Sequence, residues 1–202
     1  MIAIIDYGMG NIHSVKKALE LYGAKTKVTN NPREISACEK IVLPGVGAFG
    51  DAIAELDRRG LSALIKNEVK NKKPFLGICL GMQLLFDKSE EAAGSKGLGI
   101  IKGVVKRFTV TDLKVPHMGW NQLKKVKSDC LLLKSIPDGA YVYFCHSYYP
   151  VPADKDTMAA TTDYGLNFSS IVWQDNVYGA QFHPEKSQGT GLKMLENFVN
   201  LC

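Results

Sequence analysis

A cysteine framed by two glycines has the surroundings of a chemical nucleophile. The segment Gly77-Ile78-Cys79-Leu80-Gly81 joins an apolar, strand-like run to a helical pattern. Strand, tight turn and helix with this glycine spacing are typical of a nucleophile elbow, here with sulfur in place of a hydroxyl. The glycines permit the turn that lifts the sulfur clear of the sheet, and the start of a helix favours a thiolate. A buried structural cysteine is the alternative, and the double-glycine frame favours the nucleophile.

A histidine and a glutamate near the end of the chain could complete such a site. They stand two apart in Phe182-His183-Pro184-Glu185. Proline disfavours helical angles at the preceding residue, so we expect an extended segment in which His183 and Glu185 face the same side. The carboxylate would then orient the imidazole, giving a nucleophile–base–orienter set with Cys79. A surface turn is the alternative. The other histidines are weaker candidates, expected on a helix (His13), in a turn (His117) and at a strand end (His146).

A glycine-rich segment could supply donors for an oxyanion. Leu43-Pro44-Gly45-Val46-Gly47-Ala48-Phe49-Gly50 follows an apolar run and precedes a helical pattern. A backbone N–H from Val46 or Gly47 could join that of Leu80, which follows the cysteine. Phosphate binding is the rival interpretation. It is disfavoured because G-x-x-x-x-G-K-[ST] is absent and His13 stands where the last glycine of a dinucleotide fingerprint belongs. A purely structural turn stays open.

The first half of the chain alternates between strand-like and helical patterns. We expect strands at 2–6, 25–29, 40–43 and 75–78, and helices at 11–21, 52–56, 61–69 and 82–86. Such alternation indicates a parallel sheet covered on both faces. The second half has short β-like runs at 101–108, 141–146, 158–162, 170–174 and 178–182, then a helix at about 190–199. The sequence therefore predicts one α/β domain, residues 1–202, with a mostly parallel central sheet flanked by helices and extended by antiparallel strands.

Composition and charge argue against several other kinds of protein. The net charge of +5 comes from scattered lysines and arginines with no nucleic-acid motif, so we expect no nucleic-acid partner. Five cysteines without paired spacing or C-x-x-C argue against a disulfide framework and a zinc site, and neither metal nor cofactor is expected. No apolar run is long enough to span a bilayer, and no secretory signal is visible. We expect a cytoplasmic protein.

Taken together, the motifs resemble the class I glutamine amidotransferases. The matching segments are Gly77-Ile78-Cys79-Leu80-Gly81-Met82-Gln83 and Phe182-His183-Pro184-Glu185. Within that class, the chain is similar nearly from end to end to the glutaminase subunits of imidazole glycerol phosphate synthases. This closer resemblance is carried by Asp6-Tyr7-Gly8-Met9-Gly10-Asn11, Pro44-Gly45-Val46-Gly47-Ala48-Phe49, Pro116-His117-Met118-Gly119-Trp120-Asn121 and Tyr143-Phe144-Cys145-His146-Ser147-Tyr148.

The resemblance implies a reaction, a partner and further site residues. A Cys79 thiolate would attack the side-chain amide of glutamine, and ammonia would pass to a (β/α)8 cyclase subunit in a heterodimer. That partner would make imidazole glycerol phosphate and an aminoimidazole carboxamide ribotide in histidine biosynthesis. The resemblance assigns glutamine binding to four residues, Gln83, Glu91, Ser147 and Tyr148. It places three more near the partner, Asn11, Trp120 and Tyr143. The segment 44–47 would switch activity on when the cyclase binds its own substrate.

Three other functions stay open from the residues alone. The glutaminase could serve another synthase, in the pyridoxal phosphate or anthranilate pathway, although segment 116–121 favours the histidine pathway. The chain could be a cysteine peptidase or related hydrolase on a similar sheet. It could also be a catalytically inactive amidotransferase that serves as a binding module. The intact Cys79, His183 and Glu185 argue against this.

Overall fold

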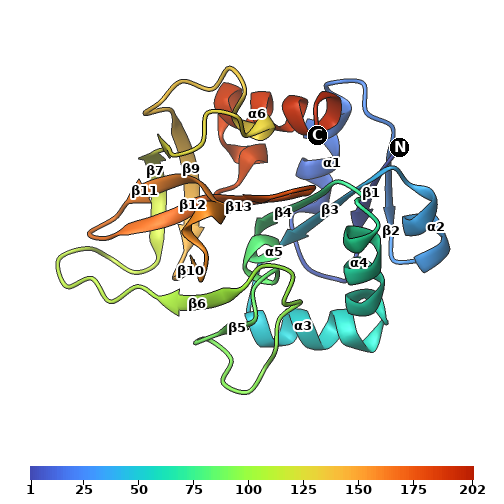
Figure 1. Ribbon diagram of the computed structural model, residues 1–202, viewed down its shortest axis with the longest axis horizontal. Helices are drawn as coiled ribbons and strands as arrows, with labels where there is room; N and C mark the ends of the chain where they lie inside the picture. The colour runs from blue at the N-terminus through green and yellow to red at the C-terminus, as the bar shows by residue number, and fades with distance from the viewer.

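An eight-stranded sheet forms the centre of the molecule, for which a computed structural model describes residues 1–202 (Figure 1). The first five strands in spatial order are parallel and the last three are antiparallel. This confirms the predicted α/β architecture with its antiparallel extension. The order is β2 (Thr26–Thr29), β1 (Ile2–Ile5), β3 (Lys40–Gly45), β4 (Phe75–Cys79), β13 (Val177–Ala180), β12 (Asn167–Gln174), β11 (Met158–Asp163) and β8 (Lys124–Lys125).

Helices cover both faces of the sheet because its parallel strands are apolar on both sides. Helices α1 (Ile12–Glu20) and α6 (Gln188–Asn200) pack on one face, at the top of Figure 1. The opposite face carries α2 (Pro32–Ala37), α3 (Phe49–Arg58) and α4 (Leu61–Lys70). Strand β1 shows the alternation that this requires: Ile2 and Ile4 belong to the first core cluster, whereas Ala3 and Ile5 belong to the second.

Two smaller sheets and four short helical segments complete the fold. A three-stranded sheet contains β10 (Tyr148–Pro152), β6 (Gly103–Arg107) and β5 (Lys88–Ser89), and a two-stranded sheet pairs β7 (His117–Gln122) with β9 (Tyr141–His146). The short segments are α5 (Leu80–Gln83) and the 3-10 helices η1 (Leu131–Leu133), η2 (Lys155–Thr157) and η3 (Pro184–Lys186).

The predicted helix at 82–86 is wrong in its bounds, because α5 begins at Leu80 and ends at Gln83. The reason is tertiary. The carbonyl groups of Leu84, Leu85 and Phe86 accept hydrogen bonds from backbone N–H groups in the segment 98–101 rather than from a continuing helix. Segment 98–101 can approach because Gly97 precedes it: a Cβ there would collide with the carbonyl oxygen of Phe86.

The chain ends meet at the amino end of β3. The Lys40 ammonium group donates to the carbonyls of Phe198 at 2.9 Å and Val199 at 2.8 Å, and also to that of Cys202. Lysine thereby satisfies the free carbonyls at the end of α6. The terminal amine of Met1 pairs with Glu39 at 2.8 Å. Both termini therefore lie beside the first residues of β3.

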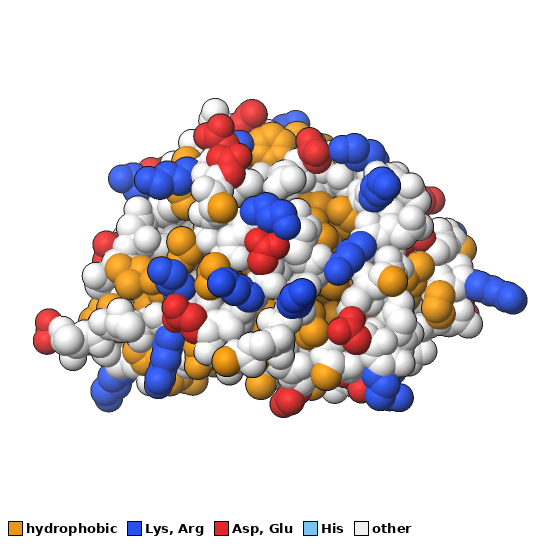
Figure 2. Space-filling view, turned by 60° about the horizontal axis from the view of Figure 1, so that its bottom comes forward, with side chains coloured by type: hydrophobic (Ala, Val, Ile, Leu, Met, Phe, Trp, Pro, Cys, Tyr) orange, Lys and Arg blue, Asp and Glu red, His pale blue; other side chains and the backbone are white.

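The surface carries dispersed charge. On the face shown in Figure 2, lysine and arginine side chains are spread among acidic and hydrophobic ones. None of the helices combines the length and the apolar character that crossing a lipid bilayer requires.

Candidate active site

A cavity opens where the carboxyl ends of the parallel strands β3, β4 and β13 meet, which is where α/β sheets usually bind ligands. Its volume is about 340 Å³. It brings together nine of the residues predicted from the sequence: Val46, Gly47, Cys79, Leu80, Gln83, Glu91, Ser147, Tyr148 and His183. Pro116, Cys145, His146 and Lys186 complete its lining.

Cys79 lies in the tight turn that the sequence predicts, between β4 and α5. Its backbone angles are φ +54° and ψ −109°, a conformation that L-residues rarely adopt. The flanking glycines are sterically required: a Cβ on Gly77 would lie 2.6 Å from the carbonyl oxygen of Gly81, and one on Gly81 would overlap that of Leu43. The helix that follows has only four residues. Its dipole therefore favours a thiolate less than the sequence suggested.

His183 and Glu185 are in contact as predicted, but the backbone between them has a different conformation from the predicted one. The His183 Nδ1 lies 3.0 Å from the Glu185 Oε1, and the two side chains are 4% and 1% exposed. Strand β13 ends at Ala180, and His183 has extended backbone angles, but residues 184–186 form the 3-10 helix η3. His183 is therefore extended as predicted, but the prediction that the extended segment continues to Glu185 is wrong. A 3-10 turn, not strand alternation, brings the carboxylate to the imidazole.

The surroundings of His183 favour the protonated imidazole. Burial alone would lower its pKa, but the interactions with the nearby Cys79 and with the hydrogen-bonded Glu185 outweigh burial and raise the pKa to about 10. An imidazolium beside a cysteine stabilises the thiolate, which is the reactive form. The second carboxylate oxygen of Glu185, Oε2, is buried without a hydrogen-bond partner.

The glycine-rich loop after β3 borders the same cavity. Gly45 pairs with Cys79 across the sheet, so the next residues, Val46 and Gly47, lie beside the cysteine turn. The backbone N–H groups of Val46 and Gly47 donate to no acceptor within the chain. Gly47 has φ +99°, which glycine adopts without strain. The loop therefore offers free donors at the edge of the cavity.

Two predicted glutamine-binding side chains are fixed by hydrogen bonds. The Gln83 Nε2 donates to the carbonyl of Tyr148 at 2.9 Å and to the Gln181 Oε1 at 3.1 Å. The Glu91 Oε2 accepts from the backbone N–H of Phe49 at 2.9 Å, at the start of α3, where a carboxylate is favourable. Each side chain reaches the cavity in an orientation set by its neighbours.

The predicted partner residues lie outside the cavity. Trp120 on β7 faces Tyr143 on β9, and their rings meet edge to face at 6.0 Å. Trp120 is 46% exposed, beside the exposed Met118 and Tyr141. Asn11 is separate, directly before α1. The carbonyl of Tyr143 accepts from the backbone N–H of His183 at 3.0 Å, so this face is one hydrogen bond from the histidine.

Two groups near the cavity were not assigned a role from the sequence. His117, expected in a turn, is buried in β7, with its Nδ1 at 3.0 Å from the Nε2 of His146. The fully buried Gln181 directs its Nε2 toward the Cys79 sulfur at 3.8 Å. Alternation along 141–146 could have placed His146 on the buried side. For Gln181, no signal in the sequence indicates the contact.

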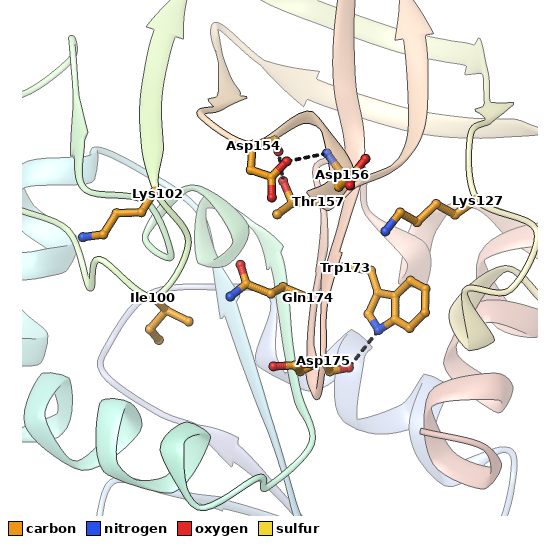
Figure 3. A pocket seen from close by; sticks show the side chains of 9 residues that line it. All are labelled: Ile100, Lys102, Lys127, Asp154, Asp156, Thr157, Trp173, Gln174 and Asp175. Carbon is orange, nitrogen blue, oxygen red and sulfur yellow. Dashed lines mark hydrogen bonds between the residues drawn. The ribbon is translucent and has the colours of Figure 1, made fainter.

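A second, larger cavity of about 570 Å³ shares no lining residue with the first (Figure 3). It contains neither cysteine nor histidine. The Trp173 Nε1 donates to the backbone carbonyl of Asp175 at 2.8 Å, and the Lys127 ammonium lies 5.2 Å from the Trp173 ring centre. No group of three or more His, Cys, Asp or Glu side chains in the molecule is arranged to bind a metal ion.

Known proteins share this sequence and fold. The sequence profile described as "Glutamine amidotransferase class-I" matches residues 3–202. The imidazole glycerol phosphate synthase subunit HisH of Methanocaldococcus jannaschii is 53% identical over 201 residues, covering 100% of both chains. The subunit of the same name from Desulfitobacterium hafniense (strain DSM 10664 / DCB-2) is 52% identical, covering 98% of this chain and 93% of that one.

Solved structures with far lower sequence identity have the same fold. PurLQS from Thermotoga maritima superposes with a TM-score of 0.76 at 19% identity, covering 98% of this chain and 96% of that one. The glutaminase domain of CTPS from Trypanosoma brucei, solved with bound acivicin, gives 0.70 at 18%, covering 98% and 92%. With the profile match and the end-to-end identity above, the chain belongs to the class I glutamine amidotransferases and, within them, to the family of HisH subunits.

Proposed function

We propose that this enzyme hydrolyses glutamine to glutamate and ammonia, with Cys79, His183 and Glu185 as its catalytic residues. The observation that carries the proposal is the convergence of the strained Cys79 turn and the Glu185-paired His183 on one cavity. The thiolate attacks the side-chain amide carbon, and the His183 imidazolium gives a proton to the departing ammonia. Water then attacks the thioester, His183 takes up a proton from it, and glutamate leaves.

The negative oxygen formed in each attack needs donors. The backbone N–H of Leu80, at the start of α5, and one from Val46 or Gly47, in the loop after β3, are available at the cavity. Removing one such donor typically costs about 2.7–4 kcal/mol of transition-state stabilisation. A rotation of the loop peptide at 46–47 would therefore be enough to switch the glutaminase on or off.

Glutamine recognition follows from the atoms left free. Both Nε2 hydrogens of Gln83 are used within the chain, so only its Oε1 can accept a hydrogen bond from the substrate. The Glu91 carboxylate suits the α-ammonium group of glutamine, and Ser147 and Tyr148 also line the cavity and provide backbone for the substrate. A cavity of about 340 Å³ is adequate for one amino acid.

The ammonia passes to a (β/α)8 cyclase subunit in a heterodimer. The relatives are named as subunits of imidazole glycerol phosphate synthase, which supports the same partner and a place in histidine biosynthesis, with imidazole glycerol phosphate and an aminoimidazole carboxamide ribotide as products. The exposed Trp120 packs against the partly buried Tyr143, and an aromatic pair of this kind suits that interface; we assign Asn11 to the same side. The whole chain, 1–202, acts as one amidotransferase domain in the cytoplasm.

Replacing the sulfur tests this proposal. In the complex with the cyclase, Cys79→Ala should abolish glutamine-dependent synthesis and leave ammonia-dependent synthesis intact, because only the ammonia supply is lost. Cys38→Ala, which alters another buried cysteine, serves as the control. A glutamine-like chloroketone should label Cys79, whereas peptide-based inhibitors should not. Retention of glutamine turnover by Cys79→Ala would refute the assignment.

A further inference from the structure

Gln181 is a fully buried polar residue for which the proposed reaction gives no role. It follows β13 directly and precedes His183 by two residues. Its Nε2 lies 3.8 Å from the Cys79 sulfur, and its Oε1 accepts from the Gln83 Nε2 at 3.1 Å. Gln181 does not line the cavity, so it contacts the sulfur from the protein side while glutamine would approach from the other.

The orientation of the Gln181 amide is determined by its neighbours. The Gln83 Nε2 donates to the Tyr148 carbonyl, which can only accept, so the nitrogen of Gln83 must be the atom on that side. The same nitrogen then meets Gln181, which must present its oxygen. The remaining atom of the Gln181 amide, its nitrogen, faces the sulfur and donates to it.

The Tyr148 carbonyl begins a hydrogen-bonded relay that runs through Gln83 and Gln181 to the Cys79 sulfur. This carbonyl also accepts a second hydrogen bond. It accepts from the His146 Nδ1 at 2.8 Å, and the His146 Nε2 accepts in turn from the His117 Nδ1 at 3.0 Å. Burial lowers the pKa of His117 to about 4 and, as the largest of several causes, that of His146 to about 3. Both rings are therefore neutral at pH 7, and the carbonyl fixes which nitrogen of each carries the proton.

We propose that Gln181 is a positioning residue for the nucleophile, aligned through Gln83 and the Tyr148 carbonyl to donate a hydrogen bond to the Cys79 sulfur. The inference rests on the proposed glutaminase function and adds a residue to it. A donor to sulfur stabilises the thiolate relative to the thiol and restrains the rotation of the side chain. Other titratable groups also face the sulfur: Tyr7 and His183 interact with it electrostatically, and Glu91, His146 and Lys186 line the same cavity.

Two substitutions of Gln181 separate donation from packing. Gln181→Glu keeps the shape and the acceptor for Gln83 but turns a carboxylate oxygen toward the sulfur. Gln181→Met keeps the approximate volume and removes the donor. The rate of Cys79 alkylation by iodoacetamide is followed against pH in the intact chain, by mass spectrometry of the Cys79 peptide. The pH of half-maximal rate should rise by about one unit in Gln181→Met and by about two in Gln181→Glu.

Turnover in the cyclase complex gives an independent measurement. The kcat for glutamine should fall about tenfold in Gln181→Met, with KM within about twofold of the wild-type value, because Gln181 does not line the cavity. Gln174→Met, an exposed glutamine of the second cavity, should change neither kcat nor the alkylation profile.

An unchanged alkylation midpoint in a folded Gln181 variant would overturn the inference, and so would loss of folding in both variants, which would make Gln181 a packing residue. Failure of the proposed function would look different. The wild-type complex would then not turn over glutamine, whatever the alkylation profile of the variants.

Discussion

The Cys79 cavity and the Trp173 cavity differ in ways that their sizes do not indicate. The Trp173 cavity is the larger of the two, at about 570 Å³ against 340 Å³, but most of the side chains around it are exposed, and the hydrogen bonds of Trp173, Asp154 and Thr157 stay within their own segments. The Cys79 cavity has buried polar groups behind it that come from β4, α5, β7, β9 and the residue that follows β13, and they bond to one another. Burying polar groups is costly unless they are paired, so such a network indicates function better than volume does.

Each cavity also contains a residue other than glycine with a positive φ, but the reason for this conformation differs between the two. Asp175, at φ +52°, lies in the two-residue turn between β12 and β13, where aspartate adopts such angles readily. The φ of Cys79, +54°, is not explained by its residue type. Strain becomes informative when the local turn does not account for it.

The largest expected difference between the two cavities is in activity. His183→Ala should lower kcat for glutamine in the cyclase complex by about 10³-fold, because proton transfer to ammonia and stabilisation of the thiolate are both lost. Glu185→Ala should be milder, since the imidazole remains. Trp173→Ala should change kcat by less than about twofold. A comparable loss from Trp173→Ala would show that the second cavity takes part in the reaction.

Partner binding should distinguish the only two tryptophans of the chain. Trp120→Ala is expected to weaken binding of the cyclase by about 30-fold, the usual cost of about 2 kcal/mol for an aromatic residue at the centre of an interface. Trp173→Ala should leave binding unchanged. Titration calorimetry with the purified cyclase measures both, and alkylation of Cys79 in the free subunit should be the same in the two variants. Equal affinities of the two variants for the cyclase would show that β7 and β9 are not part of the interface.

The smallest expected effect concerns stability. Cys79→Gly should be more stable than Cys79→Ala by about 1 kcal/mol, because glycine relieves the left-handed conformation that alanine keeps. The corresponding pair at Asp175, Gly against Ala, provides the matched control in the second cavity. Urea unfolding gives the free energies. A more stable alanine variant at Cys79 would mean that the turn relaxes when the sulfur is removed.

Local patterns predicted the elements that depend on local preference. The strand at 141–146 was predicted with the bounds that β9 has, and apolar runs identified the parallel strands. Strand β10 was missed because Pro150 and Pro152 argue against a strand; it is an edge strand, where proline is tolerated. Helix α2 was missed because it buries only Ile35, although Asn31-Pro32 is a helix-start signal.

The same distinction between local and long-range features applies to the candidate site. Cys79, His183 and Gly47 were predicted from short motifs whose geometry is largely local, and the structure places all three around one cavity. The relay behind the cysteine joins Gln83 to Gln181, 98 residues apart, and His117 to His146. Such pairs arise only when strands from distant parts of the sequence meet, so no pattern in either segment predicts them. Their roles stay predictions.

The hydrogen bonds from Lys40 to the end of α6, together with the Met1–Glu39 pair, hold both chain ends at the amino end of the parallel strands, whereas the Cys79 cavity lies at their carboxyl end. A surface or a second protein attached through either terminus would leave the mouth of the cavity facing solution. The enzyme should therefore tolerate immobilisation, provided that the linker leaves Lys40 in contact with the last turn.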